Sequence, residues 1–394
     1  MTRWFLADLR TGRQILDLNV LSGTWAQALN QPETLDVTVD LQDPATVSLG
    51  LFNSATTSKT VLGCAEGDVI MGAGPVWSRT YDREAKTLRL SAKGIWSYFD
   101  HRYVEQLLAA TVDVTAFTVP DSVDPTKTVP NPALSTTYSN LSLGTIASRL
   151  VALAQSWAGG NVPVLLPPDE VAGNTRTYIG AEFQNLGEAL RQISQVQNGP
   201  DIVFQPQWTP DRLGVQWQLQ VGTAEQPLLY ANAVNHWDVT LPGSSASALV
   251  VDEDATSVAS LAWQVGGRST DDVLVSRSYD PTLVNLGFPL FETLDGSHSS
   301  VSEQATLDAY AAEATLYGLG PIQVWTFVAE AHQYPLVGSY RVGDFCELTV
   351  GAYNPDTGAG DPFLPPGTYQ QRIVGISGDQ DGNQVKISCA PSRG

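Results

Sequence analysis

One arrangement of strands and turns occurs twice in this chain of 394 residues, and it constrains the fold more than any other feature. In its first copy, a Gly-Asp turn at 67–68 precedes a strand over 69–71, a Gly/Pro break at 72–75 and a second strand over 76–81. A third strand at 88–93 alternates apolar and polar residues, which is typical of a strand with one buried face. The first copy therefore predicts an antiparallel meander.

The second copy lies near the C-terminus and keeps the same order. It has a Gly-Asp pair at 343–344, a strand over 345–350, a Gly/Pro-rich loop over 351–367 and two strands, 372–377 and 384–389, joined by a turn. Internal repeats are sought before any other pattern because they decide the whole fold. We therefore predict a duplicated β unit, although two unrelated β-meanders would share this outline.

Further strands complete the first unit. Strand patterns occur at 4–8, 15–20 and 25–29, and the stretch 35–41 alternates apolar residues with Asp and Thr. Such alternation favours antiparallel strands that bury one face. We expect six or seven short strands before residue 104, as in a small barrel or sandwich.

The composition changes after Leu107. Residues 111–140 are rich in Thr, Pro, Ser, Asp and Asn, and we interpret them as a long ordered loop or an extended arm. Ser142 is suited to begin a helix that ends at the glycines 159–160, and a second helix fits 185–197. Two helices between loops indicate an inserted α/β domain.

Strand patterns return beyond this region. They occur at 202–204 and 215–221, and a further pair is expected at 260–265 and 272–278. A third helix is expected over 301–317, where apolar residues recur at helical spacing. The chain is therefore mainly β with an inserted α+β part.

The charge balance excludes one broad class of function. Forty-one acidic residues against 21 basic residues give a net charge of −20, which argues against a general nucleic-acid-binding surface. No apolar run approaches the 18 residues of a membrane span, and the N-terminus has no signal-peptide layout. The three cysteines, Cys64, Cys346 and Cys389, form no CxxC motif, and we interpret them as buried free thiols.

Catalytic motifs are missing from the sequence. None of the four histidines has HExxH spacing, and there is no GxSxG, Walker A or Rossmann glycine motif. A pair of carboxylates for glycoside hydrolysis stays open, because its members need not be close in sequence. We therefore predict no enzyme activity and name no catalytic, cofactor-binding or metal-binding residues.

Three weaker patterns have two interpretations each. The stretch 379–383 (DQDGN) favours a hairpin turn over a calcium loop, because its glycine falls at the fourth position and no distal glutamate follows. The acidic run 252–254 is interpreted as a solvated loop, with a cation site as the alternative. Five tryptophans indicate core and subunit packing before a carbohydrate-binding surface: Trp77, Trp96, Trp217, Trp263 and Trp325.

Five patches carry a family resemblance. They are 74–82 (GPVWSRTYD), 88–100 (LRLSAKGIWSYFD), 305–311 (ATLDAYA), 340–344 (YRVGD) and 372–377 (RIVGIS). Together they resemble minor tail proteins of long-tailed phages that infect actinobacteria. Such proteins are similar to baseplate hubs, to the N-terminal part of tail-associated lysins and to the hubs of contractile tails.

The resemblance implies a fold. It predicts two related small antiparallel β-barrels of the tail-tube type, with inserted lateral domains. The expected domains are a first barrel at 1–104, a lateral α/β domain at 105–201 with its loop at 111–140, a discontinuous second barrel at 202–240 and 319–391, and a second lateral part at 241–318.

The resemblance also implies partners and a location. Three chains would form a homotrimeric ring that adapts the sixfold tail tube to a threefold tip. Its partners would be the distal tail protein ring, a central fibre or tip protein and the C-terminus of the tape measure protein, in a virion tail tip assembled in the host cytoplasm. Because the chain ends at Gly394, just after the last strand, we expect no lytic activity.

Two further hypotheses complete the predictions. Acidic residues would line the lumen of the ring and repel DNA phosphate, because each chain carries a charge of −20. The rival functions are a carbohydrate-binding receptor module, suggested by the tryptophans and the Thr/Pro-rich loop, and a cell-wall-degrading enzyme.

Overall fold

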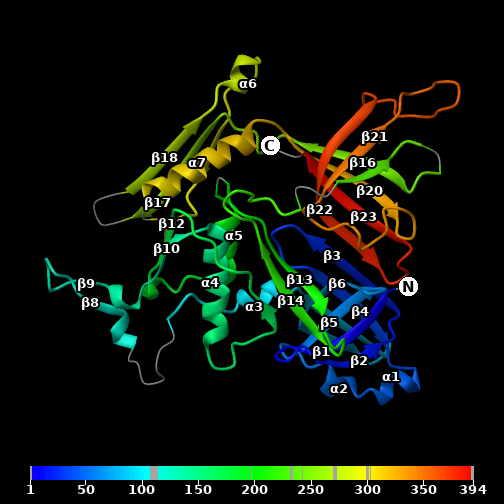
Figure 1. Cartoon of the computed structure of the whole chain (residues 1–394), viewed down its shortest axis with the longest axis horizontal. Helices are drawn as coiled ribbons and strands as arrows, with labels where there is room; N and C mark the ends of the chain where they lie inside the picture. The colour runs from blue at the N-terminus through cyan, green and yellow to red at the C-terminus, as the bar shows by residue number, and fades with distance from the viewer. Residues whose placement is uncertain are drawn as a thin grey trace.

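The fold is mainly β, with antiparallel sheets and a separate helical part (Figure 1). A computed structural model describes residues 2–106, 114–196, 198–230, 234–241, 243–268, 273–298, 301 and 303–391. The predicted elements and domains also cover residues outside these ranges, namely 1, 107–113, 197, 231–233, 242, 269–272, 299–300 and 302. The N-terminal strands and short helices are β1 Arg3–Asp8, β2 Gln14–Leu18, β3 Ser22–Ala28, β4 Thr34–Asp40, α1 Pro44–Ser48, α2 Leu51–Ser54, β5 Thr60–Glu66, β6 Val69–Asp82, β7 Thr87–Lys93 and α3 Trp96–Phe99.

The largest sheet runs through both repeats. Its strand order is β16-β20-β23-β22-β3-β4-β7-β6-β5-β1-β2, and β15 and β21 extend it from β22. The C-terminal strands are β15 Val234–Asp238, β16 Ala246–Asp254, β20 Ile322–Glu330, β21 Phe345–Val350, β22 Gly367–Asp379 and β23 Gln384–Pro391. We call β3-β4-β7-β6 the first half-sheet and β16-β20-β23-β22 the second half-sheet.

The two half-sheets repeat each other in register. β6 has a bulge between Val76 and Ser78 against β7, and β22 has a bulge between Ile373 and Gly375 against β23. Both long strands pair with a different partner before the bulge, β5 for β6 and β21 for β22. A duplication is therefore present in the strand order and the pairing. The predicted match of 69–71 with 345–350 was wrong, because 69–71 belongs to β6, the counterpart of β22, whereas 345–350 forms β21, the counterpart of β5.

One buried core lies under both half-sheets. It includes Leu35, Val37 and Leu90 from the first half-sheet and Trp325 and Phe327 from the second. These residues alternate with polar neighbours along each strand, as the period of two predicts. The alternating pattern therefore gave the correct buried face.

Two details of the predicted β units differ from the structure. The Gly/Pro stretch at 72–75 does not break β6, because the strand continues while its partner changes from β5 to β7. Gly74 permits this change, since a Cβ there would lie 1.9 Å from the Lys93 carbonyl oxygen. Among the described strands, the path of the sheet stays open, from β16 to β2, instead of closing into a barrel.

The lateral part packs on the other face of β1, β5 and the start of β6 (Figure 1). A second core there joins Phe5, Trp96, Ile146, Leu190 and Trp217. The elements around it are β10 Thr136–Leu141, α4 Leu143–Ser156, β11 Val164–Leu165, β12 Asn174–Tyr178, α5 Leu186–Ser194, β13 Ile202–Trp208 and β14 Val215–Val221. The first two predicted helices are confirmed, and Ser142 and Asn185 cap them.

The strands β13 and β14 differ from the expected assignment. β14 pairs with β13 and with β11 in a separate sheet, and both strands belong to the second core, whereas the resemblance implied that they group with 319–391. Among the described residues of the expected segment 202–240, β15 alone joins the strands of the C-terminal repeat, by parallel pairing with β21. Strand periodicity could not test the implied grouping, because it does not identify the partner of a strand.

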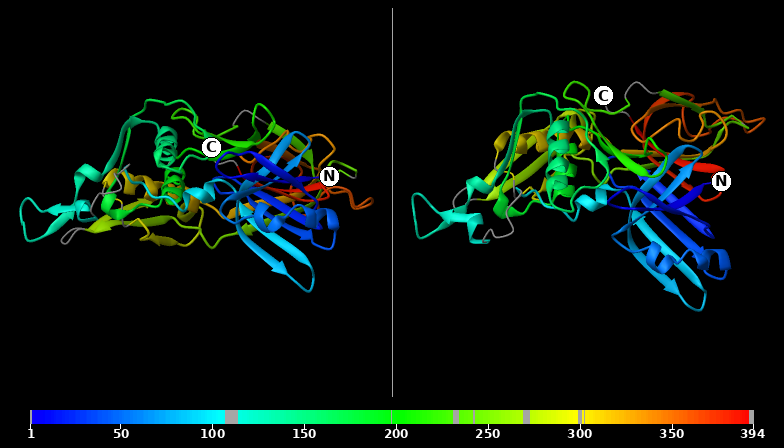
Figure 2. Two further views of the ribbon diagram at one scale, coloured as in Figure 1. Left: turned by 90° about the horizontal axis from the view of Figure 1, so that it is seen from below. Right: turned by 60° about the horizontal axis from the view of Figure 1, so that its bottom comes forward.

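A further layer and an arm complete the chain. β17 Leu261–Arg268, β18 Val273–Tyr279 and β19 Glu292–Asp295 form a sheet against α7 Gln304–Gly318, next to the short helix α6 Thr282–Asn285. The strand pair and the helix expected here are confirmed. The residues predicted to form an arm include η1 Val114–Phe117, β8 Thr118–Pro120, β9 Thr128–Pro130 and η2 Pro132–Leu134, and η3 Gly180–Glu182 contacts η2. The β8–β9 hairpin projects from one end of the molecule (Figure 2).

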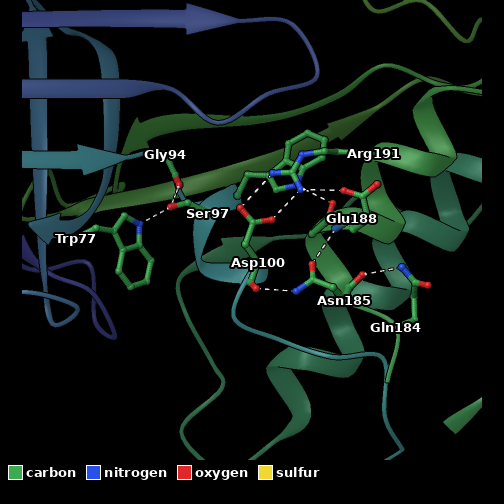
Figure 3. Close-up of polar contacts among 10 residues, drawn as sticks. Trp77, Gly94, Ser97, Asp100, Gln184, Asn185, Glu188 and Arg191 are labelled. Carbon is green, nitrogen blue, oxygen red and sulfur yellow. Dashed lines mark hydrogen bonds and ion pairs between the residues drawn. The ribbon is translucent and has the colours of Figure 1, made fainter. Parts of the chain in front are cut away.

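Polar contacts fasten the lateral helices to the first repeat (Figure 3). Arg191 on α5 donates two hydrogen bonds to the Asp100 carboxylate, at 2.9 and 3.1 Å, and Asn185 Nδ2 donates to the Asp100 carbonyl oxygen at 2.6 Å. On the β6 side, the Trp77 indole donates to Ser97 Oγ at 2.7 Å. Two-point Arg–carboxylate pairs fix orientation, so α5 is held in a defined position on α3.

Candidate functional site

The strongest candidate site is a surface, the side of the two half-sheets that faces away from their core. Alternation places every second residue of the eight strands on this side, including Thr24, Thr38, Ser91, Thr326 and Ser377. We call it the polar face. Its charged residues are the acids Asp36, Asp40, Asp82, Asp252, Asp254, Glu330 and Asp379 and the bases Arg89, Lys93 and Lys386.

The polar face is acidic and built from short side chains. Its acids outnumber its bases, and Arg89 Nη2 is already paired with Asp36 Oδ1 at 3.0 Å. A hollow of about 350 Å³ lies on it, lined among others by Thr24, Thr34 and Ser377. Such a surface repels phosphate and offers no basic cluster to hold it.

The two half-sheets meet where β22 pairs with β3. Gly378 lies opposite Trp25, and a Cβ on Gly378 would be only 2.8 Å from the Trp25 ring. Beyond the paired residues, the Leu29 N–H donates to the Val374 carbonyl oxygen at 3.0 Å. The junction therefore combines a backbone ladder with a large side chain that fits over a glycine.

A buried ion pair ties this junction to the lateral part. Arg372 on β22 donates to the carboxylate of Asp201, which precedes β13, and both side chains are almost fully buried. Asp201 also accepts from the Leu229 N–H at 2.8 Å, and Asn30 Oδ1 accepts from the Ile202 N–H at 2.8 Å. Both half-sheets and the lateral part are thus connected at one point.

The two acidic patterns found in the sequence have structural roles. Asp379 Oδ1 accepts from the N–H groups of Asp381 and Gly382 at 3.0 and 3.3 Å, which confirms the hairpin turn between β22 and β23. The run 252–254 was interpreted wrongly as a loop, because its residues form the exposed end of the outermost strand, β16. Across the described residues, no group of three or more His, Cys, Asp or Glu side chains could hold a metal ion.

The tryptophans and cysteines are packed inside the protein. Trp96, Trp217 and Trp325 are buried, Trp77 and Trp263 are half-buried, and none of the ten tryptophans is exposed. The tryptophans therefore do not support a carbohydrate-binding surface, and the Thr/Pro-rich loop is the remaining motive for one. All three cysteines are free and buried, as predicted, and burial raises the pKa of the Cys64 thiol well above its usual range.

Two buried carboxyl groups were not found from the sequence. Burial raises the pKa of Glu33 to about 8 and that of Glu105 to about 7. Both oxygens of Glu105 have no hydrogen-bond partner among the described residues. Each occupies an irregular segment outside the helices and strands, so no periodic pattern could have marked it as buried.

Comparison with known proteins places the fold. No protein-family model and no curated protein matches the sequence. The structure resembles a tail protein from Neisseria meningitidis MC58, with a TM-score of 0.52, 12% identity and coverage of 99% of this chain and 97% of that one. It also resembles the 43 kDa tail protein of prophage MuSo2 from Shewanella oneidensis, with a TM-score of 0.53, 10% identity and coverage of 99% and 98%. The chain therefore shares, over nearly its whole length, the fold of these two tail proteins.

Within the described residues, no helix combines the length and the apolar composition needed to cross a bilayer.

Proposed function

We propose that this protein is a structural hub of a phage tail tip, in which three copies form a ring. The observation that carries the proposal is the duplicated half-sheet, because two equivalent units per chain make six units in a trimer. A ring of six similar units matches a sixfold tail tube, while its true symmetry is threefold. The fold shared with two phage tail proteins supports the same role.

The polar face would line the lumen of this ring. Its excess of carboxylates and its short hydroxyl side chains would let DNA pass without binding, because phosphate finds no basic cluster there. In the ring, the open sheets of the three chains would complete a closed barrel, since one chain alone leaves its sheet open. The lateral part and the β8–β9 arm would lie outside the lumen.

The neighbours follow from the resemblance to tail hubs. A distal tail protein ring would bind one end, a central fibre or tip protein the other, and the C-terminus of the tape measure protein would reach the lumen. We also propose that the β unit of 1–104 and the unit built around 319–391 act as the two hub domains, with the inserted residues as lateral domains. The role is structural, without enzyme activity.

The mass of the native protein tests the proposal. We expect native mass spectrometry over a concentration series to show a species of three chains of 42.3 kDa each. Averaged electron micrographs of that species should show a threefold ring with a central hole. A dimer, or a three-chain species without a ring, would contradict the hub.

A further inference from the structure

The two ends of the eight-stranded array are free and complementary. Within a chain, β22 of the second half-sheet pairs with β3 of the first. The repeat makes β6 the counterpart of β22 and β16 the counterpart of β3, because each occupies the same place in its half-sheet. Among the described strands, none pairs with the outer edge of β16 or with the outer edge of β6 beyond its bulge.

We propose that β6 of one copy pairs with β16 of a second copy in the same way that β22 pairs with β3. This inference rests on the proposed hub and specifies its subunit contact. The bulges align Ser78 with Gly375 and Tyr81 with Gly378. Leu35 on β4 and Trp325 on β20 occupy equivalent places in the two half-sheets. Trp25 lies opposite Leu35 and Val251 lies opposite Trp325, so Trp25 and Val251 are equivalent as well.

The register between the two copies follows from this alignment. Gly378 lies opposite Trp25 inside the chain, so Tyr81 would lie opposite Val251 of the second copy. In the same way, Thr80 would lie opposite Asp252 and Arg79 opposite Glu253. The strands would run antiparallel, with Ser78 and Asp254 near one end of the ladder.

Side-chain size supports this register. Inside the chain, the small residue is Gly378 on β22 and the large residue is Trp25 on β3. Between copies, the large residue would be Tyr81 on β6 and the smaller one Val251 on β16, so the large residue would lie on the opposite strand of the pair. Tyr81 is 59% exposed in the isolated chain, whereas Val251 packs against the core, so the contact would cover an apolar ring.

Charge supports the same register. Arg79 would face Glu253, and an opposite pair directly across two strands stabilises the pairing. Arg79 is held in place by hydrogen bonds to the carbonyl oxygens of Phe52 and Ala55, at 2.8 and 3.1 Å. Across β20, the described residues opposite the acidic end of β16 are Val324, Gln323 and Ile322, so the proposed pairing supplies its cation.

The outer edges of β6 and β16 lack the features that usually prevent pairing with another chain. An uncovered edge strand invites pairing with another chain, and proteins usually block it with a bulge, a proline or a lysine. The edge of β6 at 78–82 contains neither proline nor lysine, and neither does β16. The bulge of β16 between Ser247 and Val250 lies before the residues 251–254 that the register uses. A contact between two different edges is head-to-tail, so repetition of it closes a ring when the angle fits.

Paired cysteines test the register directly. The variant Thr80→Cys with Asp252→Cys places two thiols on directly opposed residues of different copies, at a spacing that a disulfide can bridge. The native cysteines are buried and serve as an unreactive background. The matched control, Thr80→Cys with Ser247→Cys, keeps one thiol on β6 and moves the other along β16, away from the proposed opposite residue.

We expect oxidation of the first variant to give a disulfide-linked ladder on a non-reducing gel that ends at three chains, at least tenfold stronger than in the control. A ladder that ends at another number would support the edge pairing and overturn the trimer. A native trimer whose Thr80→Cys/Asp252→Cys variant does not cross-link would overturn the pairing and leave the hub. An equal ladder from the control would also overturn the register.

A second variant does not depend on oxidation. Tyr81→Asp replaces an exposed ring, so the isolated chain should keep its stability while the association constant falls at least tenfold. Tyr279→Asp, at a side chain that is 51% exposed on β18, is the matched control and should change association by less than twofold. Equal association of the wild type and Tyr81→Asp would overturn the proposed contact.

Discussion

The two half-sheets share their strand order, register and bulge, but they differ in what joins their strands. A five-residue turn links β3 to β4 in the first half-sheet, whereas the equivalent strands β16 and β20 are separated by the entire layer of β17, β18, β19 and α7. β5 and β6 are joined by a tight turn, whereas a long loop separates β21 from β22. The comparison shows that hydrogen-bond register is the constant part of this fold and that loops at its margin accept insertions.

Equivalent core positions in the two half-sheets differ in size, and this gives the largest expected effect. Phe327 occupies in the second half-sheet the place of Val37 in the first, opposite Ile387 and Leu90 respectively. Phe327→Ala should lower the free energy of unfolding by about 4 kcal/mol and Val37→Ala by about 2 kcal/mol, because the larger side chain leaves the larger cavity. Urea unfolding followed by circular dichroism measures both.

The same two variants decide whether the half-sheets fold together. Because a single core lies under both, we expect each variant to shift one common transition. Two separate transitions, each moved by only one of the variants, would show that the half-sheets are independent units despite the β22–β3 ladder.

The junction between the half-sheets gives the second effect. Arg372→Met leaves the Asp201 carboxylate buried without its cation, so the free energy of unfolding should fall by about 3 kcal/mol. The double variant Arg372→Met/Asp201→Asn removes the unpaired charge and should recover part of the loss. If Arg372→Met lowers the free energy of unfolding by no more than the loss of an exposed ion pair does, the stability of the junction does not depend on the Arg372–Asp201 contact.

The sequence predicted those features that depend on local pattern. The alternation at 35–41 identified β4 and its buried face, and Ser142 and Asn185 marked the starts of α4 and α5. It did not predict that β13 and β14 belong to the lateral core, because pairing between distant strands depends on the whole fold. It also placed 252–254 in a loop, since three successive acids carry no strand pattern although β20 pairs with them.

The polar face is a second feature that could not be predicted from local sequence patterns. Each strand revealed from its own alternation which residues are polar, yet nothing in the sequence aligned eight strands so that these residues share one surface. The acidic residues Asp36, Asp82 and Asp252 are more than 200 positions apart at their extremes, and only the register places them on one face. The internal repeat was the one signal that could have suggested it.

The turn between β3 and β4 gives a third, pH-dependent effect. Glu33 in this turn is 8% exposed, and its pKa rises from 4.5 to about 8 through burial. Between these values the folded protein binds a proton that the unfolded chain does not, so stability is fully present below about pH 4.5 and is lost as the pH rises through 8. Glu33→Gln stays neutral and should be more stable than the wild type by at least about 2 kcal/mol at pH 8, since each pH unit between these values costs the wild type up to about 1.4 kcal/mol.

Urea midpoints of both proteins between pH 5 and pH 9 measure this difference. The curves should lie close together at pH 5 and separate as the pH rises. Glu84→Gln, at an exposed side chain in the turn between β6 and β7, is the control and should follow the wild type. A constant gap between wild type and Glu33→Gln at every pH would show that shape, and not charge, causes the effect.

A substitution on the polar face should give the smallest change in the free energy of unfolding. The contrast with the junction distinguishes residues that stabilise the single chain from residues that are available for assembly. Arg89 and Asp36 form an ion pair at 3.0 Å, but the Arg89 side chain is 64% exposed, so water and salt screen the interaction. Arg89→Met should therefore change the free energy of unfolding by less than about 1 kcal/mol in the same urea experiment. A loss as large as that of Arg372→Met would mean that the polar face contributes to the stability of the single chain. A small loss leaves its acids and bases available for a role outside folding, as the proposed channel requires.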